Sequence, residues 1–163
     1  MNRLTVLIVE DEAEVRDALR RDLEPLARTL RIETADDVTD ARAALADITA
    51  DGDQLALVLA DHRLPGTTGV DFLVELNTAP ETAATRKVLV TGQADHADTI
   101  RAVNRADLDH YVAKPWDPAD LVAISSGAVT DYIIAEGIDP LPFVRDLDGA
   151  RLLEAYSKRA ADR

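Results

Sequence analysis

Short runs in which nearly every residue is apolar are the feature that most constrains the fold of this chain. The clearest runs are Leu4–Val9 and Leu55–Ala60, and a shorter one lies at Val88–Val90. A strand covered on one face alternates apolar and polar residues, whereas a strand covered on both faces reads as a continuous apolar run. These three segments are therefore predicted to be buried strands of a parallel sheet.

Two weaker segments complete the predicted sheet. Leu30–Ala35 alternates more and is rich in polar residues, which is typical of a strand at the edge of a sheet. His110–Ala113 is a brief apolar segment late in the chain and is predicted to be the fifth strand.

Segments with helical spacing separate the predicted strands. Ala13–Arg28 carries apolar residues at intervals of three and four, and Pro25 is expected to bend or fray its last turn. Asp117 and Pro118 form a capping residue and a first-turn proline for a later helix, which Gly137 is placed to end. The other helices are expected at Thr39–Ala46, Gly69–Leu76 and Ala97–Arg105. Five strands alternating with five helices predict an α/β fold with right-handed crossovers.

Composition excludes several classes of protein. The 163 residues are enough for one domain with an appendage, and the absence of cysteine excludes disulfides, thiolate metal sites and cysteine nucleophiles. The net charge is -13, with no basic cluster larger than an adjacent pair, so we expect no direct binding to nucleic acid. No apolar run approaches the roughly 20 residues of a membrane span, and the first residues do not resemble a signal peptide. We therefore expect a cytoplasmic protein with no membrane contact.

The distribution of charge predicts one boundary. Residues 1–136 hold 26 acidic and 13 basic side chains, whereas residues 137–163 hold five of each. Gly137 and the following Pro140-Leu141-Pro142 stretch mark the same place. We expect a domain over residues 1–136, followed by a linker and a helical extension over residues 137–163.

The extension contains one predicted helix. Asp148 is placed to cap a helix over Gly149–Arg159, with Leu152, Leu153 and Tyr156 on one side. Such a narrow apolar stripe needs a partner to bury it. That partner is either the core of the same domain, a second copy in a homodimer, or a further effector domain, and we favour a contact with a partner.

Polar side chains follow four of the five predicted strands. They are Glu10, Asp11 and Glu12 after the first strand, Asp61 after the third, Thr91 after the fourth and Lys114 after the fifth. Each residue alone has an ordinary explanation as a turn, cap or solvated surface group. The carboxyl ends of parallel strands share one edge of the sheet, however, and that edge is where sites form in open α/β folds. The coincidence therefore predicts a site.

The chemistry that needs this set of groups is phosphoryl transfer to a carboxylate. Clustered carboxylates repel one another, and Mg²⁺ relieves that repulsion because it prefers oxygen ligands and needs only one or two carboxylates. The metal and an ammonium group can both neutralise charge on a transferring phosphoryl group, and a hydroxyl completes the cage around its oxygens.

Four segments carry a resemblance to a known family. They are VLIVEDE at Val6–Glu12, DHRLPGTTG at Asp61–Gly69, VTG at Val90–Gly92 and YVAKPWD at Tyr111–Asp117. Residues 1–136 resemble the CheY-like receiver domains of bacterial two-component response regulators. The resemblance implies a flavodoxin-like, doubly wound five-stranded parallel sheet in the order 2-1-3-4-5, flanked by five helices, with the C-terminal helix as an addition.

The resemblance also implies roles for the acidic residues. Asp61 resembles the phospho-acceptor aspartate. Glu10 and Asp11 resemble the acidic pair that holds Mg²⁺, and Asp61 and the backbone carbonyl of Arg63 would be its remaining protein ligands.

Three further residues resemble the switching machinery of the family. Thr91 resembles the hydroxyl that moves onto the phosphoryl group, and Lys114 resembles the lysine that pairs with that group. Tyr111 resembles the aromatic residue that turns inward when Thr91 moves. The Lys114–Pro115 peptide bond is expected to be cis, and Trp116 is expected to anchor helix packing.

The implied function is that of a signalling switch and not of an enzyme with an outside substrate. A sensor histidine kinase or phosphotransfer protein would supply the phosphoryl group, and a surface made by the fourth helix, fifth strand and fifth helix would control a downstream effector protein or domain. Two alternatives stay open: a receiver-fold interaction module without phosphorylation, and a magnesium-dependent phosphatase with an aspartate nucleophile. The phosphatase is disfavoured because Arg63 stands where a second aspartate would serve as general acid.

Overall fold

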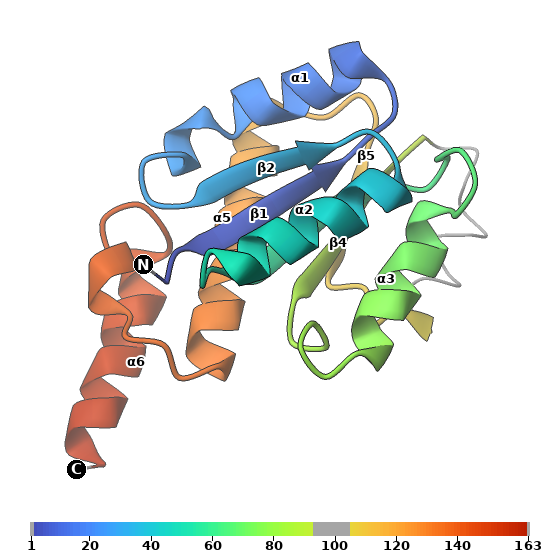
Figure 1. Cartoon of the computed structure of the whole chain (residues 1–163). Helices are drawn as coiled ribbons and strands as arrows, with labels where there is room; N and C mark the ends of the chain where they lie inside the picture. The colour runs from blue at the N-terminus through green and yellow to red at the C-terminus, as the bar shows by residue number, and fades with distance from the viewer. Residues whose placement is uncertain (1, 93–104, 163) are drawn as a thin grey trace.

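The apolar runs that predict strands form one sheet in the computed structural model, which describes residues 2–92 and 105–162. The strands are β1 (Leu4–Val9), β2 (Arg31–Ala35), β3 (Gln54–Asp61), β4 (Arg86–Thr91) and β5 (His110–Ala113). Neighbouring strands are parallel and lie in the order β2-β1-β3-β4-β5 (Figure 1). The predicted doubly wound sheet is confirmed, including β2 at its edge.

Helices connect the first four strands or follow the last one, β5. The longer ones are α1 (Ala13–Asp22), α2 (Val38–Ala50), α3 (Gly69–Thr78), α5 (Pro118–Ala135) and α6 (Gly149–Ala161), and the short 3-10 turns are η1 (Glu24–Leu26) and η3 (Leu141–Phe143). Apart from Arg105, the helix predicted over Ala97–Arg105 lies outside the described residues. No helix in the described part of the chain combines the length and apolar content that a bilayer span requires.

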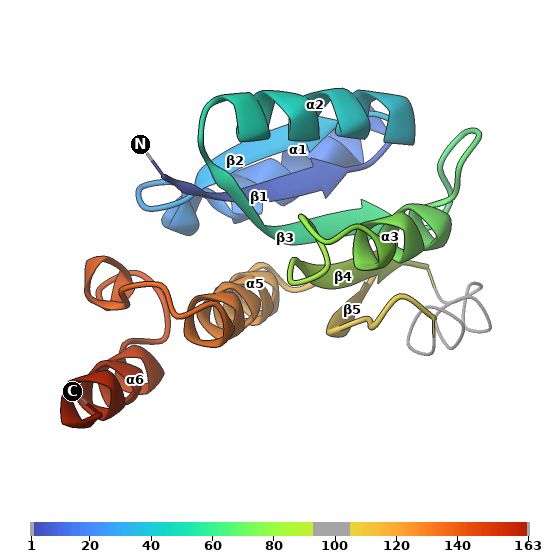
Figure 2. The ribbon, with the colours of Figure 1, turned by 60° about the horizontal axis from the view of Figure 1, so that its bottom comes forward.

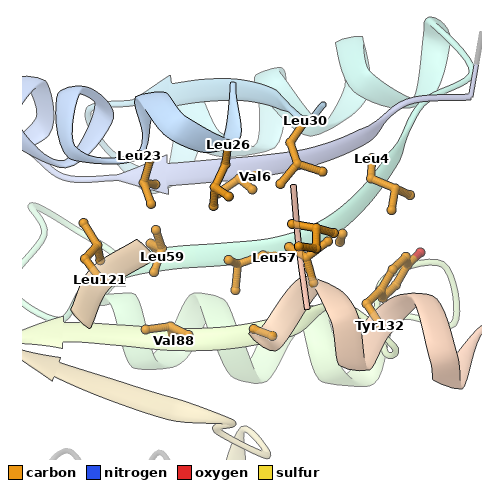
Figure 3. Close-up of a cluster of buried hydrophobic side chains, with 14 of the residues drawn as sticks. Leu4, Val6, Leu23, Leu26, Leu30, Leu57, Leu59, Val88, Leu121 and Tyr132 are labelled. Carbon is orange, nitrogen blue, oxygen red and sulfur yellow. The ribbon is translucent and has the colours of Figure 1, made fainter. Parts of the chain in front are cut away.

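The strands read as continuous apolar runs because both faces of the sheet are covered. Val6 and Ile8 of β1 point into a core shared with α1 and α5, and part of that core is drawn in Figure 3. Leu7 and Val9 of the same strand point into a second core shared with α2 and α3. Successive side chains of a strand point to opposite faces, so one run supplies both cores.

The first helix is shorter than predicted. The sequence pattern extends to Arg28, but α1 ends at Asp22 and Pro25 lies in the separate 3-10 turn η1. Proline has no backbone N–H and its ring clashes with the carbonyl of the preceding turn, so the α-helix stops before it.

The ends of α5 follow the predicted signals. The carboxylate of Asp117 accepts hydrogen bonds from the backbone N–H groups of Ala119 (2.8 Å) and Asp120 (3.2 Å). At the other end Gly137 has a φ of 64° and donates to the carbonyl of Ile134 at 3.3 Å. That left-handed conformation favours glycine, which explains why the helix ends there.

The C-terminal extension is divided between the core and the surface. Leu152 of α6 is completely buried in the core cluster that contains α5, whereas Leu153 and Tyr156 are 48% and 42% exposed. The three side chains share one face of α6 that is about 100° wide, but only its Leu152 side is covered by the core. Of the three partners considered for this stripe, the core of the same chain covers Leu152, and the favoured contact with a partner stays a prediction for Leu153 and Tyr156. Figure 2 shows α6 beside α5.

Candidate functional site

Three carboxylates meet at the carboxyl edge of the sheet. Glu10 and Asp11 directly follow β1, and Asp61 is the last residue of β3. One carboxylate oxygen of each lies within 4.8 Å of the others. Glu10 is fully buried and Asp61 is only 6% exposed, whereas Asp11 is exposed. The sequence prediction that these residues converge is confirmed in its geometry.

Lys114 brings an ammonium group to the same edge. It follows β5, and its Nζ lies 3.0 Å from Oε2 of Glu10 and 3.4 Å from Oδ1 of Asp61. Its backbone N–H donates to the carbonyl of Thr91 at 2.9 Å, which fixes the residue to the end of β4. The Lys114–Pro115 peptide bond is cis, as the resemblance implies.

The site holds more carboxylate groups than ammonium groups. Burial raises the pKa of Glu10 and of Asp61, and the ion pairs with Lys114 only partly oppose this effect. Burial would lower the pKa of Lys114, but hydrogen bonds and attraction to Glu10 and Asp61 raise it overall. One ammonium therefore faces three carboxylates, and a hard divalent cation with oxygen ligands would relieve the remaining repulsion.

Thr91 places a hydroxyl at this edge. It is the last residue of β4, is buried, and pairs in register with Ala113 of β5. Its Oγ1 donates to the carbonyl of Gly92 at 3.3 Å. Val90, the residue before it, pairs with Asp61, so the end of β4 that carries the hydroxyl lies directly beside the end of β3.

The loop after Asp61 depends on a close backbone approach. A Cβ on Gly69 would lie 1.9 Å from the carbonyl oxygen of Asp61, and the Gly69 N–H donates to the carbonyl of His62 at 3.0 Å. Only glycine allows this approach. A hydrogen bond from the backbone of Arg63 lowers the pKa of Asp61, although burial still raises it overall.

Two neighbouring side chains complete the surroundings of the site. Nη1 of Arg16, in the first turns of α1, donates to the backbone carbonyl of Glu10 at 2.9 Å, a contact that the sequence analysis did not identify. The sequence does not predict this contact, because every residue type has a backbone carbonyl that can accept a hydrogen bond. Trp116 donates from Nε1 to Oδ2 of Asp22 at 2.8 Å and packs against the core, in agreement with its expected anchoring role.

Tyr111 points away from these groups. It lies on β5, is 51% exposed, and its ring stacks on that of His110 with 6.5 Å between centroids. Gln93, which follows the described end of β4, lies outside the described residues.

Comparison with known proteins agrees with this geometry. Residues 6–126 match the family model of the response regulator receiver domain. The hydrogenase transcriptional regulatory protein HoxA of Cupriavidus necator is 39% identical over 119 residues, which are 72% of this chain and 22% of the relative. The phosphate regulon transcriptional regulatory protein PhoB of Pseudomonas aeruginosa is 31% identical over 119 residues, which are 73% of this chain and 48% of the relative. The chain thus spans less than half the length of either relative.

Solved structures agree in fold. The signal receiver domain of an HD domain-containing protein from Pseudomonas fluorescens Pf-5 has a TM-score of 0.70 at 25% identity, covering 80% of this chain and 98% of that one. A CheY-like response regulator receiver domain protein from Methanospirillum hungatei JF-1 has a TM-score of 0.66 at 25% identity, covering 80% and 97%.

Proposed function

Because the chain belongs to the response regulator receiver domain family, we propose that it is a cytoplasmic signalling switch that accepts a phosphoryl group on Asp61. The observation that carries this proposal is the position of the Asp61 carboxylate. It lies 3.4 Å from the ammonium of Lys114 and within 4.8 Å of the carboxylates of Glu10 and Asp11. An acceptor needs such neighbours because the incoming group is strongly negative.

The donor set fits Mg²⁺. Oxygen ligands alone are present, and the excess of carboxylate over ammonium favours a cation. We propose that Glu10, Asp11, Asp61 and the backbone carbonyl of Arg63 hold it. When bound, Mg²⁺ would supply neutralisation of the charge on the transferring phosphoryl group.

The proposed reaction is transfer from a phosphohistidine of a sensor histidine kinase or phosphotransfer protein. A carboxylate oxygen of Asp61 forms a bond to phosphorus while the bond from phosphorus to the imidazole nitrogen of the donor breaks, and the electron pair returns to that nitrogen. Lys114 holds the negative charge beside Asp61, and the product is an acyl phosphate on this chain. The protein is therefore a signalling component that modifies itself and not an enzyme with an outside substrate.

The proposed switch connects the acyl phosphate to the output surface. Thr91 at the end of β4 would move its hydroxyl onto the phosphoryl oxygens, and Tyr111 would turn inward from its exposed position on β5. The surface that changes would include β5 and α5, the elements on either side of Lys114.

The proposed output is a downstream effector protein or domain. The relatives are transcriptional regulatory proteins, but the charge of -13 on this chain is unsuited to contacts with phosphates of nucleic acid. Within the chain, we propose residues 1–136 as the receiver domain and residues 137–163 as its extension.

Labelling with a small phosphodonor tests the proposal. Incubation with acetyl phosphate and Mg²⁺ should add one phosphoryl group, detected by intact mass, and chelation of Mg²⁺ should prevent it. Asp61→Asn should abolish labelling, whereas Asp47→Asn, at an exposed position of α2, should leave it unchanged. Labelling that persists in Asp61→Asn would contradict the assignment. Absence of labelling in the unaltered chain would favour an interaction module, and turnover of a phosphate ester would favour the phosphatase.

A further inference from the structure

One exposed side of α6 carries no charged residue. Its members are all exposed and are small or apolar: Ala150, Leu153, Tyr156, Ser157, Ala160 and Ala161. Successive residues of an α-helix lie about 100° apart, so these side chains share one face about 140° wide, which we call the uncharged face of α6. In Figure 1 the C-terminal end of this helix extends away from the sheet.

Charged residues occupy the rest of the surface of α6, and most of them have partners within the chain. Arg151 pairs with α5, and Arg159 donates to the backbone carbonyl of Gly137 at 3.0 Å. Lys158 pairs with Glu154 at 3.3 Å. The uncharged face is therefore a distinct part of the surface in a chain of which 30% of the residues are charged.

The apolar surface continues from α6 onto η3. Leu141 of η3 is 46% exposed, and together with Tyr156 and Ala160 it borders a hollow of about 370 Å³. Single exposed apolar side chains are common on protein surfaces, but a contiguous apolar patch rimmed by polar residues marks a contact with another macromolecule.

The order of residues along the uncharged face fits a second α6 that runs in the opposite direction. Ala150, Leu153, Ser157 and Ala160 are spaced by three, four and three residues, which is the spacing of paired helices. In an antiparallel pair, Leu153 of each copy lies opposite Ser157 of the other. Each large side chain therefore meets a small one, whereas a parallel pair would place Leu153 against Leu153 and small residues against small residues.

The charges beside this face favour the same direction. Glu154 and Lys158 are exposed and lie along one edge of the face. In an antiparallel pair, Glu154 of each copy comes within about 3 Å of Lys158 of the other along the helix axis, at about 1.5 Å per residue. A parallel pair would instead bring like charges together, and such flanking charges set the partner and orientation of paired helices. Shape and charge together therefore identify a second copy of the chain as the partner.

We propose that the uncharged face of α6 binds the same face of a second copy of this chain, with the two helices antiparallel. The contact covers Leu153 and Tyr156, and the small side chains between them let the helices approach closely. One helix from each copy forms a small interface, so we expect a dissociation constant on the order of 10–100 µM. The contact is separate from the proposed phosphorylation at Asp61 and does not rest on it.

Analytical ultracentrifugation of the full chain, without a phosphodonor, tests the proposal. Leu153→Glu buries two carboxylates in the contact and should weaken the dimer at least roughly tenfold. Ile134→Glu places the same side chain at an exposed apolar position of α5, outside the uncharged face, and should leave the dimer unchanged. Asp61→Asn should dimerise like the unaltered chain, so this result is independent of the phosphorylation assay. A chain that stays monomeric at about 1 mM, or a dimer that Leu153→Glu does not weaken, would overturn the proposal.

Cross-linking tests the direction of the helices, because the chain contains no cysteine of its own. A mixture of Ala150→Cys and Ala160→Cys, oxidised with diamide, should form a disulfide between the two variants, since an antiparallel pair brings these positions together and a disulfide needs Cα atoms within about 7 Å. Either variant alone should cross-link poorly, because its two cysteines lie about 15 Å apart along the axis. Cross-linking of each variant with itself, and not in the mixture, would refute the antiparallel arrangement.

A charge exchange tests the pairing beside the face. Lys158→Glu places a carboxylate near Glu154 of the other copy and should weaken the dimer several-fold. Adding Glu154→Lys to that variant restores opposite charges and should recover the affinity of the unaltered chain. A double variant that dimerises no better than Lys158→Glu would contradict the proposed arrangement.

Discussion

The ammonium of Lys114 lies 3.0 Å from Oε2 of the buried Glu10, across a sequence separation of 104 residues. This contact joins the end of β1 to the residue after β5, two strands that are not neighbours in the sheet. It also leaves Asp61 and Asp11 without full compensation, because one cation serves the whole cluster. The site is therefore held in a charged state that costs stability and favours a cation or a covalent change at Asp61.

The stability of the protein should reveal that cost through its dependence on pH. Burial raises the pKa of Asp61, and the Asp11 carboxylate raises it further, against the lowering by Lys114. A carboxyl group whose pKa is higher in the folded state contributes stability that is present below its unfolded pKa and is lost as the pH rises through the folded pKa. Asp61→Asn should therefore increase the free energy of unfolding at pH 7 by on the order of 1 kcal/mol.

Urea unfolding at two pH values checks this prediction. The difference between Asp61→Asn and the unaltered chain should shrink as the pH falls and disappear below about pH 3, where the carboxyl group of Asp61 is protonated in both states. Asp47→Asn, on the exposed side of α2, should show no gain at pH 7. A destabilised Asp61→Asn at pH 7 would contradict the view that the site is electrostatically strained.

We expect the loop after Asp61 to require glycine at position 69. In Gly69→Ala the new Cβ would start 1.9 Å from the carbonyl oxygen of Asp61, so the loop must shift. We expect a loss of about 2–4 kcal/mol in the free energy of unfolding and slower labelling by acetyl phosphate, because the shift displaces Asp61, the proposed acceptor.

Gly127 supplies the matched control. It lies within α5, and a Cβ there would meet nothing within 4 Å, so Gly127→Ala should be neutral or stabilising by about 0.5–1 kcal/mol. Thermal unfolding and labelling rates of the two variants, measured side by side, distinguish steric conflict at the site from a general effect of adding a methyl group. Equal behaviour of the two variants would refute the steric argument.

The parts of the site that could be predicted from the sequence follow from one rule of topology. Buried parallel strands appear in the sequence as apolar runs, and their carboxyl ends share one edge of the sheet. The sequence alone therefore predicts that Asp61, Thr91 and Lys114 lie close together. The contact of Arg16 with the backbone of Glu10 could not be predicted, because every residue type has a carbonyl. A close backbone approach, such as that at Gly69, is also set by the loop path rather than by a pattern of side chains.

The burial of side chains in the C-terminal extension could likewise not be predicted from the sequence. Leu152 and Leu153 are both leucine, and only the rotation of α6 about its axis decides which one is buried. Glycine at position 149 allows α6 to start close to the preceding turn, since a Cβ there would lie 2.6 Å from the carbonyl oxygen of Val144. That rotation depends on the path of the chain through η3 and not on the helix alone.

Arg16 is predicted to position Glu10. Its Nη1 donates a hydrogen bond to the backbone carbonyl of Glu10 at 2.9 Å. Arg16→Ala should therefore let Glu10 move, without removing a carboxylate from the site. We expect the Mg²⁺ concentration for half-maximal labelling to rise roughly tenfold, as is typical when the support of a metal ligand is removed. Arg20→Ala, on an exposed position of the same helix, should leave this concentration unchanged. A simple loss of folding would instead lower thermal stability without changing the Mg²⁺ requirement of the folded fraction.

Truncation of Leu152 should show how far the extension belongs to the domain. Leu152 is fully buried in the core that includes Val129 and Ile133 of α5, and Arg151 pairs with Asp131 of that helix at 2.5 Å. Leu152→Ala should therefore lower the free energy of unfolding of the whole chain by about 2–4 kcal/mol in a single transition. Leu153→Ala removes the same atoms from an exposed position and should change the free energy of unfolding by less than about 0.5 kcal/mol.

Urea unfolding followed by the fluorescence of Trp116 reports on the receiver domain. This tryptophan is the sole one in the chain, and it donates a hydrogen bond to Asp22 of α1. If Leu152→Ala leaves that transition unchanged, α6 is an independent appendage; if it lowers the midpoint as expected, the extension and the receiver unfold as one cooperative unit.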